Sequence, residues 1–153
     1  MRFRWGRWLA AAVAFPLPSA AQQIREIGLQ GVGTASDPAL AVAGIYGGLR
    51  TSGRTRVSAS LGAGISGSEL AWRGELLAHF LLSPEERRKA GAYIAGGIAA
   101  VEGAVSRGYL VLTVGIEERP RSSSGWALEA GVGGGLRIAL GYRWRWFPGI
   151  QTQ

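Results

Sequence analysis

The most regular part of the sequence is LRIALGYRWRW, residues 136–146. Every even position in this segment is a large apolar or aromatic residue, and every odd position is Arg, Ala or Gly. A period of two is typical of a β-strand, because the faces of a helix repeat every 3.6 residues. One face of this strand would be widely apolar and the other would carry three arginines. A lipid bilayer covers such an apolar face directly, so the segment predicts a transmembrane β-barrel strand with its arginines toward the lumen.

Seven further segments alternate in the same way, and most are near the ~9–11 residues that a tilted transmembrane strand needs. They are residues 24–33, 39–50, 54–65, 69–82, 89–101, 108–119 and 125–132. Residues 90–101 also contain no charge, but a stretch of this length is too short for a membrane-spanning helix. The sequence therefore predicts an all-β protein, an eight-stranded antiparallel up-and-down transmembrane β-barrel.

The connecting segments agree with this division. Residues 66–69 separate Ile65 from Leu70, and the apolar face changes there from odd to even positions. Gly133–Gly135 form a three-residue loop, which keeps the parity of the flanking strands and favours Gly at its third position. Thr51–Gly53 form a similar loop, which is predicted to place Arg50 opposite residue 54.

The N-terminal residues have the pattern of a secretory signal peptide. Arg2, Arg4 and Arg7 precede the short apolar run 8–17, and Ser19 and Ala21 stand at the positions typical of a cleavage site. We therefore predict a signal peptide at residues 1–21, a barrel at residues 22–147 and a short C-terminal tail at residues 148–153.

Composition narrows the chemistry. The chain has no Cys and one His, so disulfides, thiolate metal sites and Cys nucleophiles are excluded, and we expect no metal and no cofactor. The formal net charge is +7, but no basic run is interleaved with aromatic residues. Together with the predicted export, this argues against nucleic acid as a partner.

The polar faces of the strands predict a charged interior, which an eight-stranded barrel can fill with its own side chains. The predicted lumen charge network consists of Arg54, Arg56, Arg73, Glu75, His79, Glu117, Glu129, Arg137 and Arg143. Further residues expected to point inward are Arg50, Glu69, Tyr93 and Arg119. Because both signs of charge are present, the expected arrangement is a plug of ion pairs, and the alternative is a path for a ligand or an ion. The outward aromatic residues Trp72, Phe80 and Trp126 are expected at the membrane interface.

The last strand also matches the sorting signal of outer-membrane barrels. Gly141 is followed at the typical spacing by Trp144 and Trp146, and Tyr142 shares their face. By these residues and the eight alternating segments, the chain resembles small eight-stranded outer-membrane β-barrel proteins of the OmpA/OmpX-like class. Its tail after the last aromatic residues departs from many members. The resemblance implies location in the bacterial outer membrane, contact with its lipid and insertion by the barrel-assembly machinery.

The function expected from the residues is that of a monomeric barrel with a side-chain-filled polar lumen and a structural or surface-interaction role. We expect no enzymatic activity. One alternative is a lipid-modifying barrel enzyme that uses His79 with Ser58 or Ser60 and the carboxylate of Glu75. Another is a soluble periplasmic barrel that binds an apolar ligand inside.

Overall fold

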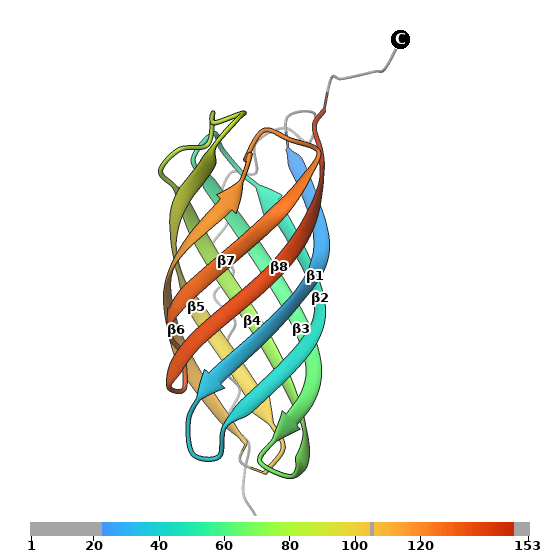
Figure 1. Cartoon of the computed structure of the whole chain (residues 1–153), viewed down its shortest axis with the longest axis vertical. Coiled ribbons are helices and arrows are strands. Elements are labelled where there is room, and N and C mark those ends of the chain that lie inside the picture. The colour runs from blue at the N-terminus through green and yellow to red at the C-terminus, as the bar shows by residue number, and fades with distance from the viewer. Residues whose placement is uncertain (1–22, 105, 149–153) are drawn as a thin grey trace, which may run out of the picture.

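Eight antiparallel strands make up almost all of the chain that the computed structural model describes, which is residues 23–148 apart from residue 105 (Figure 1). The strands are β1 (Ile24–Ala35), β2 (Leu40–Arg50), β3 (Thr55–Ser66), β4 (Glu69–Leu81), β5 (Ala90–Glu102), β6 (Arg107–Glu118), β7 (Ser124–Val132) and β8 (Leu136–Trp146). Each boundary lies within two residues of the boundary predicted from sequence alternation. The predicted signal peptide and residues 149–153 of the predicted tail lie outside the described residues.

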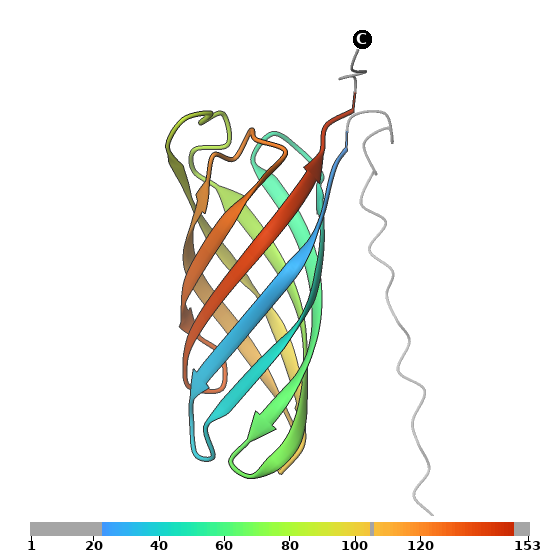
Figure 2. The ribbon, with the colours of Figure 1, turned by 45° about the vertical axis from the view of Figure 1, so that its right-hand side comes forward.

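Each strand pairs with the next one, and β8 pairs with β1 to close the barrel. Figure 2 shows these two strands side by side, with the first and last described strands reaching the same end of the barrel. We call this end the terminal end and the opposite end the outer end. Closure pairs the backbone groups of both edge strands, so neither is left as an open edge. The predicted fold class, an eight-stranded up-and-down barrel, is confirmed.

Two predicted turns have the expected register. Val132 lies opposite Leu136 across the loop of three glycines. Ile65 lies opposite Leu70, so β3 and β4 are joined by a tight turn in which Gly67 has a φ of 61°. Glycine adopts this left-handed conformation without steric penalty.

The turn between β2 and β3 differs from the prediction. Arg50 lies opposite Arg56, rather than opposite residue 54. The backbone N–H of Thr51 donates to the carbonyl of Thr55 at 3.0 Å, and the hydroxyls of Ser52 and Thr55 lie 2.6 Å apart. These bonds close a wider turn than the three-residue loop that the sequence suggested, because Thr55 rather than residue 54 begins the strand.

The two faces of the sheet have opposite chemistry. Large apolar side chains cover the outer wall, and Ile45 and Leu112 at mid-strand are 62% and 64% exposed. The inner face carries the charged residues, and Arg56 and Arg137 are 0% and 1% exposed. This arrangement is the reverse of a water-soluble protein, in which apolar groups are buried. No helix among the described residues is long and apolar enough to cross a membrane.

Aromatic side chains gather on the outer wall near the terminal end. Trp126, Tyr142 and Trp144 pack edge to face across β7 and β8, with ring centroids 5.0 and 5.1 Å apart. Phe80 lies on the same wall at the end of β4, whereas Trp72 lies near the outer end of that strand. The predicted interface aromatics are therefore exposed on the outer wall, at the two ends of the barrel.

Candidate functional site

The lumen is the part of the molecule where charged side chains converge. Alternation along each strand directs these groups inward, and the described residues bury six arginines and four glutamates there. They are Glu26, Arg50, Arg56, Arg73, Glu75, Glu117, Glu129, Arg137, Arg143 and Arg145. The arginines exceed the glutamates by two, so the network carries a net positive charge. We call this set the lumen network.

The part of the lumen network nearest the terminal end is built on two carboxylates. Glu26 accepts a hydrogen bond from Arg50 Nε at 2.9 Å, and Glu117 accepts one from Arg56 Nη1 at 2.8 Å. Arg50 also reaches Glu117, at 3.2 Å, and Arg145 Nη2 donates to the same carboxylate at 3.2 Å. Glu26 also pairs with Arg56 at 3.3 Å, so each glutamate serves more than one guanidinium. These contacts tie five strands together, β1, β2, β3, β6 and β8.

A second part continues toward the outer end. Glu129 accepts from Arg143 at 3.0 Å and from Arg137 at 2.9 Å. Arg137 also donates to Glu75 at 2.7 Å, and Arg73 Nε donates to that carboxylate at 2.6 Å. The charges alternate in sign along this path, so each buried ion has an opposite neighbour.

Tyrosines and one further contact join the two parts. Arg143 Nη1 lies 3.5 Å from Glu117, and the Tyr93 hydroxyl donates to Glu129 at 2.8 Å. The guanidinium of Arg143 also stacks on the Tyr46 ring at 4.4 Å from its centroid, a cation–π contact. Gly115 makes room for the Tyr93 ring, which would collide with a side chain there.

Apolar residues line the lumen toward the outer end. The cluster consists of Val32, Leu40, Val42, Ala71, Val101 and Ala139, with Tyr109 packed against it. A hollow of about 60 Å³ lies at the outer mouth, and one of about 10 Å³ lies beside Glu75. These volumes suit one or a few water molecules and are far below the ~300–1,000 Å³ typical of ligand pockets.

The structure brings together the predicted lumen residues with one exception. The residues that meet are Arg56, Arg73, Glu75, His79, Glu117, Glu129, Arg137 and Arg143. Arg54 was predicted in this network, and that prediction is wrong. Arg54 is exposed in the turn before β3, because the strand begins one residue later and its inward positions start at Arg56.

Two other residues expected to point inward do not. Glu69 is exposed at the first position of β4, and Arg119 is exposed just after β6, where it pairs with Glu118 at 2.8 Å. Alternation does not define a face once a strand has ended. Glu26 and Arg145 belong to the network but were not predicted in it, although the arginines of residues 136–146 were expected to face the lumen. Both have the inward parity of their segments, which was the signal available for finding them.

His79 lies in the lumen in an arrangement unlike that of a catalytic base. Its Nδ1 is 3.2 Å from Arg56 Nη2, and its Nε2 is 2.7 Å from Ser58 Oγ. A guanidinium can only donate, so Nδ1 accepts and the proton lies on Nε2, from which it is donated to the serine. A Ser–His base needs the opposite tautomer, with a carboxylate on Nδ1. Glu75, the expected orienting carboxylate, binds arginines instead.

The described residues also contain no group of three or more His, Cys, Asp and Glu side chains that could hold a metal ion. The lumen carboxylates are each engaged by guanidinium groups, which is the arrangement of an ion-pair network.

Comparison with solved structures identifies the fold. The chain is similar to the N-terminal β-barrel domain of OprF from Pseudomonas aeruginosa, with a TM-score of 0.64 and 10% sequence identity over 79% of this chain and 97% of that one. It is also similar to Ail, the attachment invasion locus protein of Yersinia pestis, with a TM-score of 0.51 and 13% identity over 82% and 99% of the two chains. Both are small eight-stranded outer-membrane barrels, so the resemblance predicted from sequence is confirmed for the fold.

No protein-family model matches the sequence, and no curated protein sequence matches it.

Proposed function

We propose that this protein is a monomeric barrel of the bacterial outer membrane, with a lumen closed by its ion-pair network and a structural or surface-interaction role. In this proposal the barrel-assembly machinery inserts the chain, and outer-membrane lipid surrounds it. The proposal assigns no enzymatic activity to the chain, because its one histidine faces an arginine rather than a carboxylate.

The observation that carries the proposal is the contrast between the two faces of the sheet. A ring of exposed apolar side chains surrounds a core of paired charges. Water would be a poor solvent for that exterior, whereas the hydrocarbon core of a bilayer matches it. A soluble barrel that binds an apolar ligand would need the apolar residues inside, so the same contrast argues against that alternative.

The short connections at the outer end support a scaffold or contact role at the surface. The turns at residues 67–68 and 133–135 are short, so little of the chain extends beyond the strands at that end. The similar Ail protein is described as an attachment invasion locus protein. We infer a scaffold or contact role for this chain, rather than transport through the lumen.

A packed lumen predicts an electrically silent barrel. Purified protein in planar lipid bilayers should give no steady single-channel conductance, because buried ion pairs occupy the lumen, and the hollows at its outer mouth and beside Glu75 measure about 60 and 10 Å³. A known open porin measured in the same bilayers provides the positive control. Large, stable conductance steps from this chain would contradict the closed lumen. The arginines would then be assigned a role in ion selectivity.

The last strand is expected to act as the assembly signal. Replacing Trp144 and Trp146 together with Ser should lower the amount of folded barrel in the outer membrane and leave chain in the periplasm, as measured by fractionation. Tryptophan favours the interface, where its ring is half apolar and its N–H stays hydrated. The matched control is the double replacement of Trp72 and Trp126, which removes two exposed tryptophans from other strands. Equal loss in both double variants would mean that β8 has no special part in assembly.

A further inference from the structure

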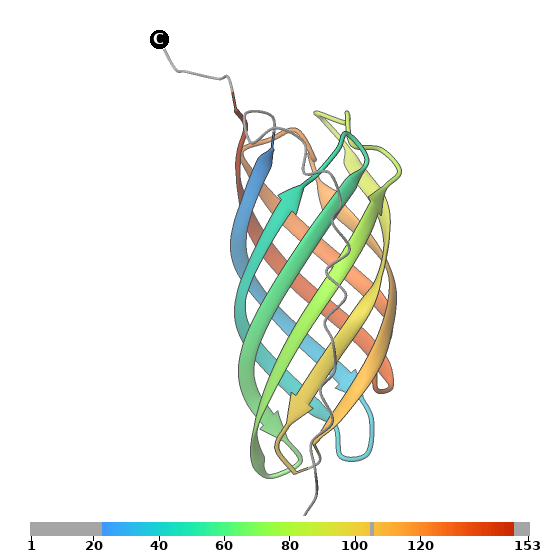
Figure 3. The same cartoon turned by 180° about the vertical axis from the view of Figure 1, so that it is seen from behind.

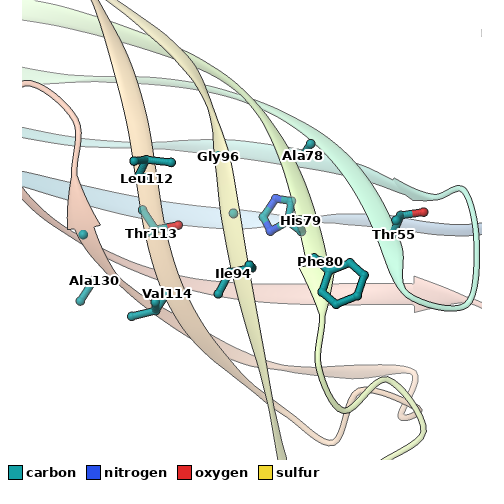
Figure 4. A pocket seen from close by; sticks show the side chains of 12 residues that line it. Thr55, Ala78, His79, Phe80, Ile94, Gly96, Leu112, Thr113, Val114 and Ala130 are labelled. Atoms are coloured by element: carbon teal, nitrogen blue, oxygen red, sulfur yellow. The ribbon is translucent and has the colours of Figure 1, made fainter.

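A groove of about 550 Å³ crosses the outer wall of the barrel over β4, β5 and β6 (Figure 4). Its floor is formed by the small residues Ala78 and Gly96, which lie opposite each other on neighbouring strands. The larger side chains of Phe80, Ile94 and Leu112 stand around this floor. Figure 3 shows this wall of the barrel, on the side away from the β1–β8 closure.

The groove runs obliquely from the rim of the barrel into its wall. Thr55 is the first residue of β3 and lies opposite Phe80 near the terminal end. From Phe80 the path crosses the neighbouring strands through paired residues. Phe80 lies opposite Ile94, and Ile94 lies opposite Val114. Val114 lies opposite Ala130, in the second half of β7. An acyl chain lying in this groove would run from the membrane interface toward the middle of the bilayer.

A basic residue adjoins the groove at the terminal end of the barrel. Arg54 lies directly before Thr55 and lines a hollow of about 460 Å³ together with residues 82–86. The two carboxylates of that hollow are already engaged. Glu85 pairs with Arg121 at 3.3 Å, and Glu86 accepts two backbone N–H groups of its own turn, which lower its pKa and keep it ionised.

The remaining charge at this rim is positive. Among the described residues, the side-chain cations of Arg54, Arg87, Arg88 and Lys89 form no ion pair within 4 Å, unlike those of Arg119 and Arg121. Basic side chains beside a membrane surface attract anionic lipid headgroups. The apolar groove therefore matches the acyl chain of a lipid, and the basic residues at the rim match an anionic headgroup.

We propose that this groove holds one acyl chain of an anionic glycerophospholipid from the leaflet nearest the termini, with the lipid phosphate bound at Arg54. This inference rests on the proposed membrane location. The lipid would occupy a fixed place on the β4–β6 wall instead of exchanging evenly around the barrel.

The test uses the full barrel in vesicles that contain equal amounts of phosphatidylglycerol and phosphatidylcholine. In one set the phosphatidylglycerol carries a photoactivatable acyl chain, and in the other the phosphatidylcholine does. Cross-links mapped by mass spectrometry should gather on β4–β6 with the anionic probe and spread evenly with the zwitterionic one. Arg54→Gln should lower the preference for the anionic probe about fivefold, whereas Arg107→Gln at the outer end should leave it unchanged.

Two variants fill the groove without touching the lumen. Gly96→Leu and, separately, Ala78→Leu should abolish the local cross-links. Gly47→Leu is the matched control, because it adds the same side chain to open space on the outer face of β2. Each variant is first checked for heat-modifiable gel mobility, which reports a folded barrel.

The outcomes separate the two proposals. Wild-type chain that does not insert into the vesicles would contradict the membrane location itself. Wild-type chain that inserts but is labelled evenly around its wall, or equally by both probes, would overturn the lipid site alone. Loss of labelling in Gly47→Leu equal to that in the groove variants would overturn it too.

Discussion

Glu117→Gln is expected to lower the free energy of unfolding by about 3–5 kcal/mol, because it leaves buried arginines without their shared carboxylate. Glu117 lies within 3.5 Å of Arg50, Arg56, Arg143 and Arg145. Arg56 is fully buried, so water cannot replace the lost charge. The measurement is urea unfolding of the barrel in lipid vesicles, followed by gel mobility or tryptophan fluorescence.

The neighbouring carboxylate supplies the control. Glu118 is on the same strand and pairs with Arg119 at 2.8 Å, but both side chains are more than two-fifths exposed. Glu118→Gln should therefore change the free energy of unfolding by less than about 1 kcal/mol. Similar losses in the two variants would show that the lumen network is not a buried electrostatic unit.

The second large change in the free energy of unfolding is expected from a substitution on the outer wall. Ile45 lies at the middle of β2 between Leu29 and Leu61 on the neighbouring strands, and it is 62% exposed. Ile45→Arg should lower the free energy of unfolding in vesicles by about 2–4 kcal/mol, because it places a charge near the bilayer midplane. The same urea titration measures this change.

Depth in the membrane provides a matched comparison. Leu136 is 70% exposed at the start of β8, next to the outer turn. Leu136→Arg should cost only about 0–1 kcal/mol, since a charge near the interface stays hydrated. A barrel in water would tolerate both arginines equally well. An Ile45→Arg variant as stable as the wild type would therefore argue against a lipid-facing wall.

The fold could be predicted from the sequence because local rules act on every residue of a strand. Period-two alternation assigns a face to each position of residues 136–146, and the three glycines at 133–135 fix the register of the strands they join. The parity change between Ile65 and Leu70 required a turn of particular length, and the structure has that turn. Agreement between strands and turns limits the chain to one arrangement.

The ends of the strands were less predictable, and so were the partners across the lumen. Parity predicted inward side chains for Arg54, Glu69 and Arg119. Each of these residues lies at or beyond a strand end, and its side chain is exposed. The pairing of Arg50 with Glu117 joins residues 67 positions apart. Such pairs depend on the shear and closure of the whole barrel, which alternation within one strand does not encode.

The groove on the outer wall could not be predicted from the sequence either. Ala78 and Gly96 are ordinary outward residues of two separate strands, and they form a floor only because the β4–β5 register sets them opposite each other. The hollow beside the groove is likewise formed by turns that are distant in the chain, since Arg54 and residues 82–86 line it together at the terminal end.

The most direct test of a lipid-embedded barrel is fractionation of cells that produce the full-length chain, combined with gel mobility before and after boiling. The chain should be recovered in the outer-membrane fraction. Its unboiled form should migrate differently from its boiled form, because a closed barrel resists detergent until it is heated. Recovery in the soluble periplasmic fraction, with one mobility under both conditions, would contradict the account.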